Sequence, residues 1–328
     1  MRRSKRRRRL LARLRRKVDA LQDEERYPEA MSQARRVLTM TRRYLGSSDP
    51  AYISSLNNLG MLTAWVGDGR AAERLLRRAV ERGREVLGEH HADRVPPLKN
   101  VAQLSREAGR LAEAAAFLQQ AVAIQRMTSR VDRANLLDDL TGLAELHENT
   151  GRYQTAARLY DEALSIVRAT SSPRHPDTIA ILNNLAVLRL ELGRPGEAEQ
   201  LAQEALDIQR AESGEEHPDF ATCLHTLAGV RFEMGDLVSA EALYQRALDI
   251  TRKALGDEHA ESAAGLNALA TLYVTGGQRS RAESAYQEAL RIQRKATQST
   301  RVPNDGPAAV RDRLDRGAVM SAERLHDP

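Results

Sequence analysis

The sequence has a single cysteine, Cys223, and few aromatic residues, which make up 4% of its 328 residues. One cysteine excludes an internal disulfide framework and is typical of a protein from a reducing compartment. Aromatic residues are scarce while hydrophobic residues make up 41% of the chain. This combination favours helices packed through Ala and Leu over a sheet protein rich in Tyr, Phe and Val.

Long apolar runs are also lacking. No run approaches the roughly 20 residues that a bilayer-spanning helix needs. The basic start of the chain is followed only by the short segment Leu10-Leu11-Ala12, whereas the apolar core of a signal peptide has about 7–15 residues. We therefore expect a cytoplasmic protein.

Acidic residues are missing from the start of the chain. Residues 1–17 contain eleven Lys or Arg and no acid, so the rest of the chain has 39 basic and 45 acidic residues although the net charge is +5. Four interpretations of this segment stay open: solvated charge, weak contact with nucleic acid phosphates, weak contact with an anionic membrane through the amphipathic residues 10–21, and blocking of an acidic surface of the same chain. The segment has no aromatic residue for stacking on bases, which disfavours single-strand recognition.

A unit of 42 residues repeats along the chain. Its turn glycine recurs six times, and two alanines recur in step with it: Gly67, Gly109, Gly151, Gly193, Gly235 and Gly277, then Ala72, Ala114, Ala156, Ala198, Ala240 and Ala282, then Ala79, Ala121, Ala163, Ala205, Ala247 and Ala289. Three registers kept over six copies without an insertion predict a repeat protein.

Each unit reads as two helices separated by the glycine. Leucine lies eleven residues before the glycine, Leu or Val eight before, and Gly or Ala seven before, as in Leu182, Leu185 and Ala186. Spacings of three and four place these residues on one face, and the small residue allows the two helices to approach closely. Between units, His-Pro-Asp at 175–177 and 217–219 suits the first turn of a helix, where proline and an acid are favoured.

The pattern also predicts the boundaries of the parts. We expect a flexible basic arm at residues 1–9, a capping helix pair at 10–45, six full repeats at 46–297, and a flexible tail at 298–328. The cap is a degenerate unit because Glu25 replaces its turn glycine, as terminal repeats often differ. The predicted fold is an all-α, right-handed superhelix.

The repeat resembles the tetratricopeptide repeat, with a period about eight longer than the usual 34 residues. The segments Leu-Asn-Asn-Leu-Gly at 56–60 and Leu-Asn-Asn-Leu-Ala at 182–186, with the Ala-Leu-x-Ile ends at 205–208 and 247–250 and the His-Pro-Asp junctions, are similar to kinesin light chain repeats. Such repeats also occur in bacterial proteins, alone or joined to signalling ATPases. The resemblance implies a protein-binding scaffold, with the first helices lining a concave groove.

Carrying the family pattern over by position gives the candidate groove residues. They are Asn57, Asn58, Trp65, Lys99, Asn100, Arg106, Asp138, Glu145, Glu148, Asn183, Asn184, Val187, Leu190, His225, Phe232 and Asn267. Asparagine amides suit an extended peptide backbone, although they also suit a structural role in tying adjacent repeats together. The middle of the groove is acidic and its C-terminal half is more apolar. This composition predicts a peptide ligand with basic residues and an apolar anchor.

Catalytic motifs are absent. The sequence contains no Gly-x-x-x-x-Gly-Lys-Ser/Thr loop and no Gly-x-Ser-x-Gly elbow. His90, His91 and Asp93 have metal-ligand chemistry, but the recurrence of His at 175, 217 and 259 favours a junction role. We expect no enzyme activity, no cofactor and no metal. The alternatives to a scaffold are an adaptor that acts through its basic arm and the recognition part of a larger signalling system. The sequence leaves the partner and the oligomeric state undetermined.

Overall fold

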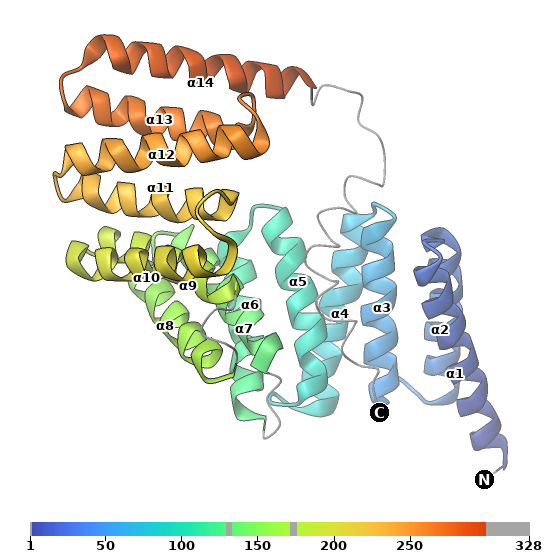
Figure 1. The fold of residues 1–328 in the computed structure, drawn as a ribbon. Coiled ribbons are helices and arrows are strands. Elements are labelled where there is room, and N and C mark those ends of the chain that lie inside the picture. Colours follow the sequence, from blue (N-terminus) through green and yellow to red (C-terminus); the bar gives the residue numbers. More distant parts are fainter. Residues whose placement is uncertain (1, 129–132, 171–175, 300–328) are drawn as a thin grey trace. The chain divides into compact units, whose positions relative to one another are not determined.

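The computed structural model describes residues 2–128, 133–170 and 176–299, and in these ranges all regular structure is helical (Figure 1). The helices are α1 (Arg2–Asp23), α2 (Tyr27–Tyr44), α3 (Pro50–Trp65), α4 (Gly69–Leu87), the 3₁₀ turn η1 (Ala92–Arg94), α5 (Val95–Glu107), α6 (Leu111–Met127), α7 (Arg133–Glu148), α8 (Tyr153–Thr170), α9 (Pro176–Glu191), α10 (Pro195–Ser213), α11 (Pro218–Glu233), α12 (Leu237–Leu255), α13 (Ala260–Thr275) and α14 (Arg279–Ser299). The all-α prediction is confirmed.

The helices belong to two compact units. The first unit ends at Asp139 and the second begins at Leu140, so the boundary falls within α7. We call them unit 1 and unit 2. In unit 1 the hairpins α1/α2, α3/α4 and α5/α6 follow one another, and in unit 2 α9/α10, α11/α12 and α13/α14 do so. The expected single block of repeats at 46–297 is therefore divided between two units, each built from the same hairpin.

The six turn glycines adopt a left-handed backbone conformation, as expected for glycines that end a helix. All six have positive φ values, between 72° and 94°, a region that only glycine enters without cost. In the degenerate first hairpin the same place is taken by Glu25, whose φ is 60°. It is the one non-glycine residue with positive φ in the described ranges. The left-handed turn is thus kept in the first hairpin at the expense of local strain, because the hairpin geometry requires it.

The predicted small-residue registers form the packing core. The two alanines that follow each turn glycine are at most 4% exposed in every repeat. In the first full repeat the small residue of the first helix is also tightly packed: a Cβ atom at Gly60 would lie 2.7 Å from Leu76 Cδ2. The two helices of this hairpin therefore approach to a distance that leaves no room for a larger side chain.

The histidines at the repeat junctions cap the first helices. The Nδ1 atoms of His91, His217 and His259 accept hydrogen bonds from the backbone N–H two residues later, at 3.2, 3.2 and 3.4 Å. In the first repeat Asp49 holds the same register and accepts from the Ala51 N–H at 2.9 Å. The junction role predicted for these histidines is confirmed for the described residues, while His175 lies outside them.

Ion pairs join the second helices of neighbouring repeats. In unit 2 an arginine near the end of one second helix reaches an acid 36 residues later, as in Arg168–Glu204 at 2.5 Å and Arg252–Glu288 at 2.8 Å. In unit 1 Glu113 of α6 accepts from Arg77 of α4 and from Arg110. These two guanidinium groups hold the pKa of Glu113 down at about 2. The side chains are partly exposed, so each pair contributes only about 0–1 kcal/mol.

The N-terminal segment differs from the prediction. Residues 2–9, expected as a flexible arm, form the first two turns of α1. Arginine is a good helix former, and Arg7 lies over the Tyr44 ring at 4.9 Å. Further along α1, Val18 and Leu21 pack with Ala30, Ala34 and Val37, as expected for the capping pair at 10–45.

The C-terminal end differs at its start, because α14 extends to Ser299 and so includes the first two residues of the expected tail. The rest of the tail, residues 300–328, lies outside the described residues. Within those residues, no helix is both long enough and apolar enough to cross a bilayer.

The first prediction tests the assigned core through Leu185 and Ala198, which are 1% and 0% exposed. Leu185→Ala should lower the free energy of unfolding by roughly 2–5 kcal/mol, because it leaves a cavity. Ala198→Leu should lower it by about 1–3 kcal/mol, because the site has no spare volume. Urea denaturation measures both effects. Val238→Ala is the control, since Val238 is 82% exposed, and losses no larger than that of the control would contradict the core.

The second prediction concerns the histidine caps. His217→Ala removes the acceptor of the Asp219 N–H, and we expect a loss of about 1 kcal/mol in unfolding free energy. His217→Asp should retain stability, since Asp49 caps the equivalent helix. Thermal melting of both variants decides the point: equal destabilisation by Ala and Asp would show that capping is not what His217 contributes.

Candidate functional site

The candidate groove residues lie on the first helices of the repeats, which we call the first-helix surface of each unit. In unit 1 they are on α3 and α5, with Asp138 on α7, and in unit 2 they are on α7, α9, α11 and α13. The groove was predicted as one surface, whereas these residues belong to two units.

The asparagine amides bind neighbouring side chains. Asn100 Nδ2 donates to Asn57 Oδ1 at 2.8 Å, Asn183 Nδ2 donates to Cys223 Sγ at 3.4 Å, and Asn184 Nδ2 donates to the Tyr160 hydroxyl at 3.0 Å. Each bond joins residues of two successive repeats. The amides therefore have the structural role that the sequence left open beside peptide binding. Asn58 is exposed and lines a hollow of about 80 Å³ with Ser54 and Ser55.

Three further candidates are held in packing or in an ion pair. The Trp65 ring meets Tyr27 edge-on at 5.3 Å and packs in the core that joins the first two hairpins. His225 meets Tyr244 edge-on at 4.9 Å, and burial lowers its pKa, which favours the neutral imidazole. Lys99 Nζ lies 2.6 Å from Oδ1 of Asp139, a carboxylate that is only 3% exposed. These residues stabilise the stack.

Three carboxylates lie close together on the first-helix surface of unit 2. Glu145 and Glu148 are on α7 and Glu191 is on α9, and we call them the carboxylate cluster. Burial raises the pKa of Glu148, and the charges of Glu145 and Glu191 raise it further. Within the described part of the chain, neither Glu148 nor Glu191 has a basic side chain at ion-pair distance. Glu148 and Glu191 therefore carry negative charge that no ion pair among the described residues neutralises.

Tyrosines of the second helices pack against the first-helix surface of unit 2, and the sequence did not predict them. Tyr160 of α8 is fully buried, and burial together with Glu145 and Glu148 raises its pKa. Tyr244 of α12 lies beneath His225, and burial and Glu233 raise its pKa to about 12. The Tyr286 hydroxyl of α14 lies 3.3 Å from Thr271 Oγ1. These three residues share one register, nine after the turn glycine, and this spacing is the signal that could have revealed them.

Apolar side chains continue the surface beyond the carboxylate cluster. Val187 of α9 is 40% exposed and has the register of Glu145 in the next repeat, and Val274 of α13 is 57% exposed. Leu190 and Phe232 are half-buried, and Phe232 packs against the core of the last two repeats. Of the remaining candidates, Asn267 is half-buried, while Asp138 and Arg106 are exposed, the latter donating to Gln103 at 2.7 Å.

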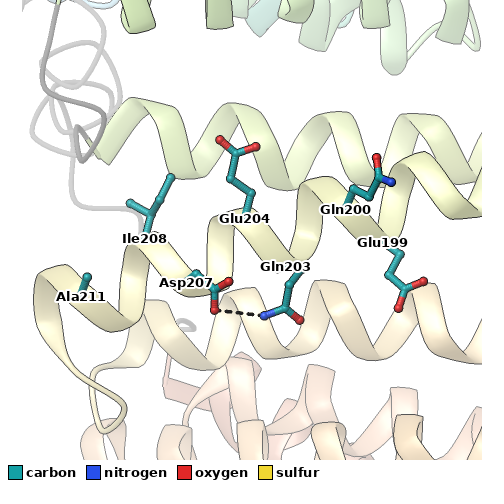
Figure 2. Close-up of a pocket in the computed structure, with 7 residues that line it drawn as sticks. All are labelled: Glu199, Gln200, Gln203, Glu204, Asp207, Ile208 and Ala211. Carbon is teal, nitrogen blue, oxygen red and sulfur yellow. Dashed lines mark hydrogen bonds between the residues drawn. The ribbon is translucent and has the colours of Figure 1, made fainter.

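A hollow of about 800 Å³ lies along α10 and is lined by Glu199, Gln200, Gln203, Glu204, Asp207, Ile208 and Ala211 (Figure 2). All seven residues come from one helix. Its carboxylates already have partners: Glu199 pairs with Arg231, Glu204 with Arg168, and Asp207 with Arg210 and Gln203. This hollow is therefore a weaker candidate than the carboxylate cluster, in which Glu148 and Glu191 have no ion-pair partner among the described residues.

The remaining reactive groups are the Cys223 thiol and the possible metal ligands. Cys223 is fully buried, and burial raises the pKa of its thiol, as expected for a core residue and not for a nucleophile. Among the described residues, no group of three or more His, Cys, Asp or Glu side chains has an arrangement that holds a metal ion.

The comparisons with known proteins identify the family. Models of the tetratricopeptide repeat match residues 10–51, 53–127, 135–211 and 219–295. The chain therefore belongs to the tetratricopeptide repeat family, a class whose repeats bind proteins or peptides. The first match covers the degenerate hairpin with Glu25, and the last ends at residue 295 in α14. A search of curated proteins finds no match.

Solved structures give the same result. The chain is similar to a putative kinesin light chain with nearly identical TPR-like repeats from Podosopora anserina, with 26% identity, a TM-score of 0.54, and coverage of 62% of this chain and 97% of that one. It is also similar to BtubC (BKLC) from P. vanneervenii, with 22% identity, a TM-score of 0.55, and coverage of 74% and 94%. The apo form of RapI shares the fold at 15% identity and a TM-score of 0.55, with coverage of 75% and 99%. The resemblance to kinesin light chain repeats is confirmed.

The third prediction concerns the crowding of charge at Glu148. Because the pKa of Glu148 is raised in the folded chain, its ionised carboxylate destabilises the folded state above that pKa. Glu148→Gln should therefore raise the urea midpoint at pH 8. The gain should shrink as the pH falls through the raised pKa of the folded state and should be absent below about 4.3, the ordinary pKa of glutamate, where Glu148 is protonated in both states.

Glu283→Gln, on an exposed face of α14, is the control, and its effect should not change in the same way with pH. A Glu148→Gln variant that is less stable than the wild type at pH 8, or whose gain grows in acid, would contradict the assignment.

Proposed function

We propose that this chain is a non-catalytic scaffold that binds a protein or peptide on the first-helix surface of unit 2. The ligand carries basic side chains that meet the carboxylate cluster and an apolar side chain that contacts the neighbouring valine. The repeat family supports the general activity, since its members bind proteins or peptides. A chain with one cysteine supports a cytoplasmic location.

The observation that carries the proposal is the grouping of Glu145, Glu148 and Glu191 on one surface, where burial and the two like charges raise the pKa of Glu148. A carboxylate that is partly buried beside two like charges is unfavourable in the free protein. A ligand cation placed among the three carboxylates would remove this repulsion and form charge-assisted hydrogen bonds of about 1.5–3 kcal/mol each. Part of the binding energy would thus come from Glu148 and Glu191, which have no ion-pair partner in the described part of the chain.

The apolar part of the ligand is supported by Val187, which follows Glu145 at a spacing of 42 residues and is 40% exposed. Burying such a side chain contributes about 25 cal/mol for each Å² of apolar surface removed from water. A basic residue and an apolar residue that lie one repeat apart on the ligand would contact both features. The amides of Asn100, Asn183 and Asn184 are already bonded to neighbouring repeats, so we assign ligand selectivity to the carboxylates and the valine.

The fourth prediction tests this function with synthetic peptides. Fluorescent 12-residue peptides that alternate Lys or Arg with Leu or Phe should bind the protein more tightly than matched peptides with Glu in place of the basic residues. Glu145→Gln combined with Glu148→Gln should weaken the binding of the basic peptides by about 10-fold or more, because each charged contact is worth 1.5–3 kcal/mol. Fluorescence anisotropy measures both.

The control is Glu216→Gln combined with Glu283→Gln, which removes the same charge from exposed positions outside the first-helix surface of unit 2. Both double variants should fold as the wild type does by circular dichroism. Equal affinity for basic and acidic peptides, or equal weakening by the two double variants, would rule out the cluster as the binding site.

A further inference from the structure

The two units carry opposite charge. Up to Asp139 the sequence has 29 basic and 17 acidic residues, a net charge of +12, whereas Leu140–Asn304 has 17 basic and 23 acidic residues, a net charge of −6. Of the 29 basic residues up to Asp139, 26 are arginine. The surface proposed above for peptides belongs to the acidic unit, so the positive charge of unit 1 requires a separate explanation.

The positive charge is concentrated where the start of α1 meets the end of α2. The contact between the Arg7 guanidinium and the Tyr44 ring, at 4.9 Å, shows that these two helix ends lie together. They carry six exposed arginines, which we call the basic corner: Arg6, Arg7, Arg8, Arg9, Arg42 and Arg43. In the described part of the chain, none of the six has an acidic side chain at ion-pair distance.

Further arginines continue this charge along the second helices of unit 1. Arg36 and Arg42 of α2 are followed 42 residues later by Arg78 and Arg84 of α4, and all four side chains are exposed. Arg35 and Arg36 also line a hollow of about 260 Å³ with Thr39 and Met40. The equivalent helices of unit 2 instead pair their arginines with acids of the next repeat.

The chemistry of these side chains favours phosphate as the partner. Arginine presents a planar fork that binds phosphate oxygens through two parallel hydrogen bonds, whereas lysine acts as a point charge. In α1 Arg9 and Arg13, and Arg13 and Lys17, are like charges four residues apart, which destabilise a helix. A polyanion bound along α1 would remove this repulsion.

Membrane binding is disfavoured by the burial of the apolar face of α1. An amphipathic helix binds a bilayer by inserting its apolar face. In α1, however, Leu11, Val18 and Leu21 are only 4–6% exposed. Leu10, at 40%, is the exposed large apolar side chain among the described residues of α1. The apolar face is thus used within unit 1. Nucleic acid requires no apolar contact, and a duplex presents one phosphate charge for every ~1.7 Å of its axis.

We propose that the basic corner binds the phosphate backbone of double-stranded nucleic acid without reading its sequence. The corner offers no free aromatic ring for stacking on unpaired bases, since Tyr44 lies beneath Arg7. Backbone contacts of this kind give affinity that falls steeply with salt and is similar for unrelated sequences. The surface is separate from the one proposed for peptides, so either proposal can fail while the other stands.

The fifth prediction tests this proposal with two 30-base-pair DNA duplexes of unrelated sequence, the full chain, and fluorescence anisotropy at several salt concentrations. Both duplexes should bind equally, with affinity that falls linearly in a log–log plot against salt. Arg9→Gln combined with Arg42→Gln and Arg43→Gln should make the slope shallower by about 0.9 for each phosphate contact removed. Hydrogen exchange in α1 should slow when DNA is added.

The matched control is Arg152→Gln combined with Arg158→Gln and Arg279→Gln, which removes the same charge from exposed positions of unit 2 and should leave the slope unchanged. Vesicles with 30% anionic phospholipid are tested in parallel. The proposal fails if no duplex binds at 50 mM salt, if both triple variants change the slope equally, or if vesicles bind and DNA does not.

Discussion

Close contact between helices at alanine is the constraint on which the fold depends. Two alanines follow each turn glycine, and their burial is nearly complete in all six repeats. A larger side chain at these positions would separate the helices, and a hairpin alone cannot bury its apolar face, so each repeat is stable only against its neighbours. This explains why the period of 42 residues is kept without an insertion.

The constant period also determines how polar side chains meet. Because neighbouring hairpins are related by one repeat, an arginine on one second helix reaches an acid 36 residues later, and an asparagine on one first helix reaches a side chain of an adjacent repeat. Exposed ion pairs add little stability. Their effect is to neutralise the second helices of unit 2, so that unbalanced negative charge is left on its first helices.

The sequence predicted what depends on spacing alone. The six glycines, the alanine registers and the leucine face of the first helices were predicted from periodicity, and even the left-handed turn at Glu25 follows from its register. The sequence did not predict individual side-chain contacts, because these depend on which side chains pack together in the folded chain. The imidazoles of His91 and His217 could have been recognised as caps from Asp49 in the same register, but the Tyr160 hydroxyl beneath Asn184 required the packed structure.

The helical state of residues 2–9 was missed because a dense run of like charge suggested an arm, whereas the run continues an amphipathic helix held by Val18 and Leu21.

The helical state of α1 also bears on the idea that its arginines block the acidic surface of the same chain. From Leu11 onwards α1 is held by buried side chains, and exposing Leu11, Val18 and Leu21 would cost about 1.5–3 kcal/mol each. Only the first two turns, which end before Leu11, are free of this cost. The two candidate partners for these first two turns differ in charge density. The carboxylate cluster has three carboxyl groups, one of them with a raised pKa. A duplex offers a continuous row of phosphates. A helix with many like charges gains most from the partner that neutralises all of them together, so physical chemistry favours phosphate for α1 and leaves the carboxylate cluster for a ligand with few positive charges.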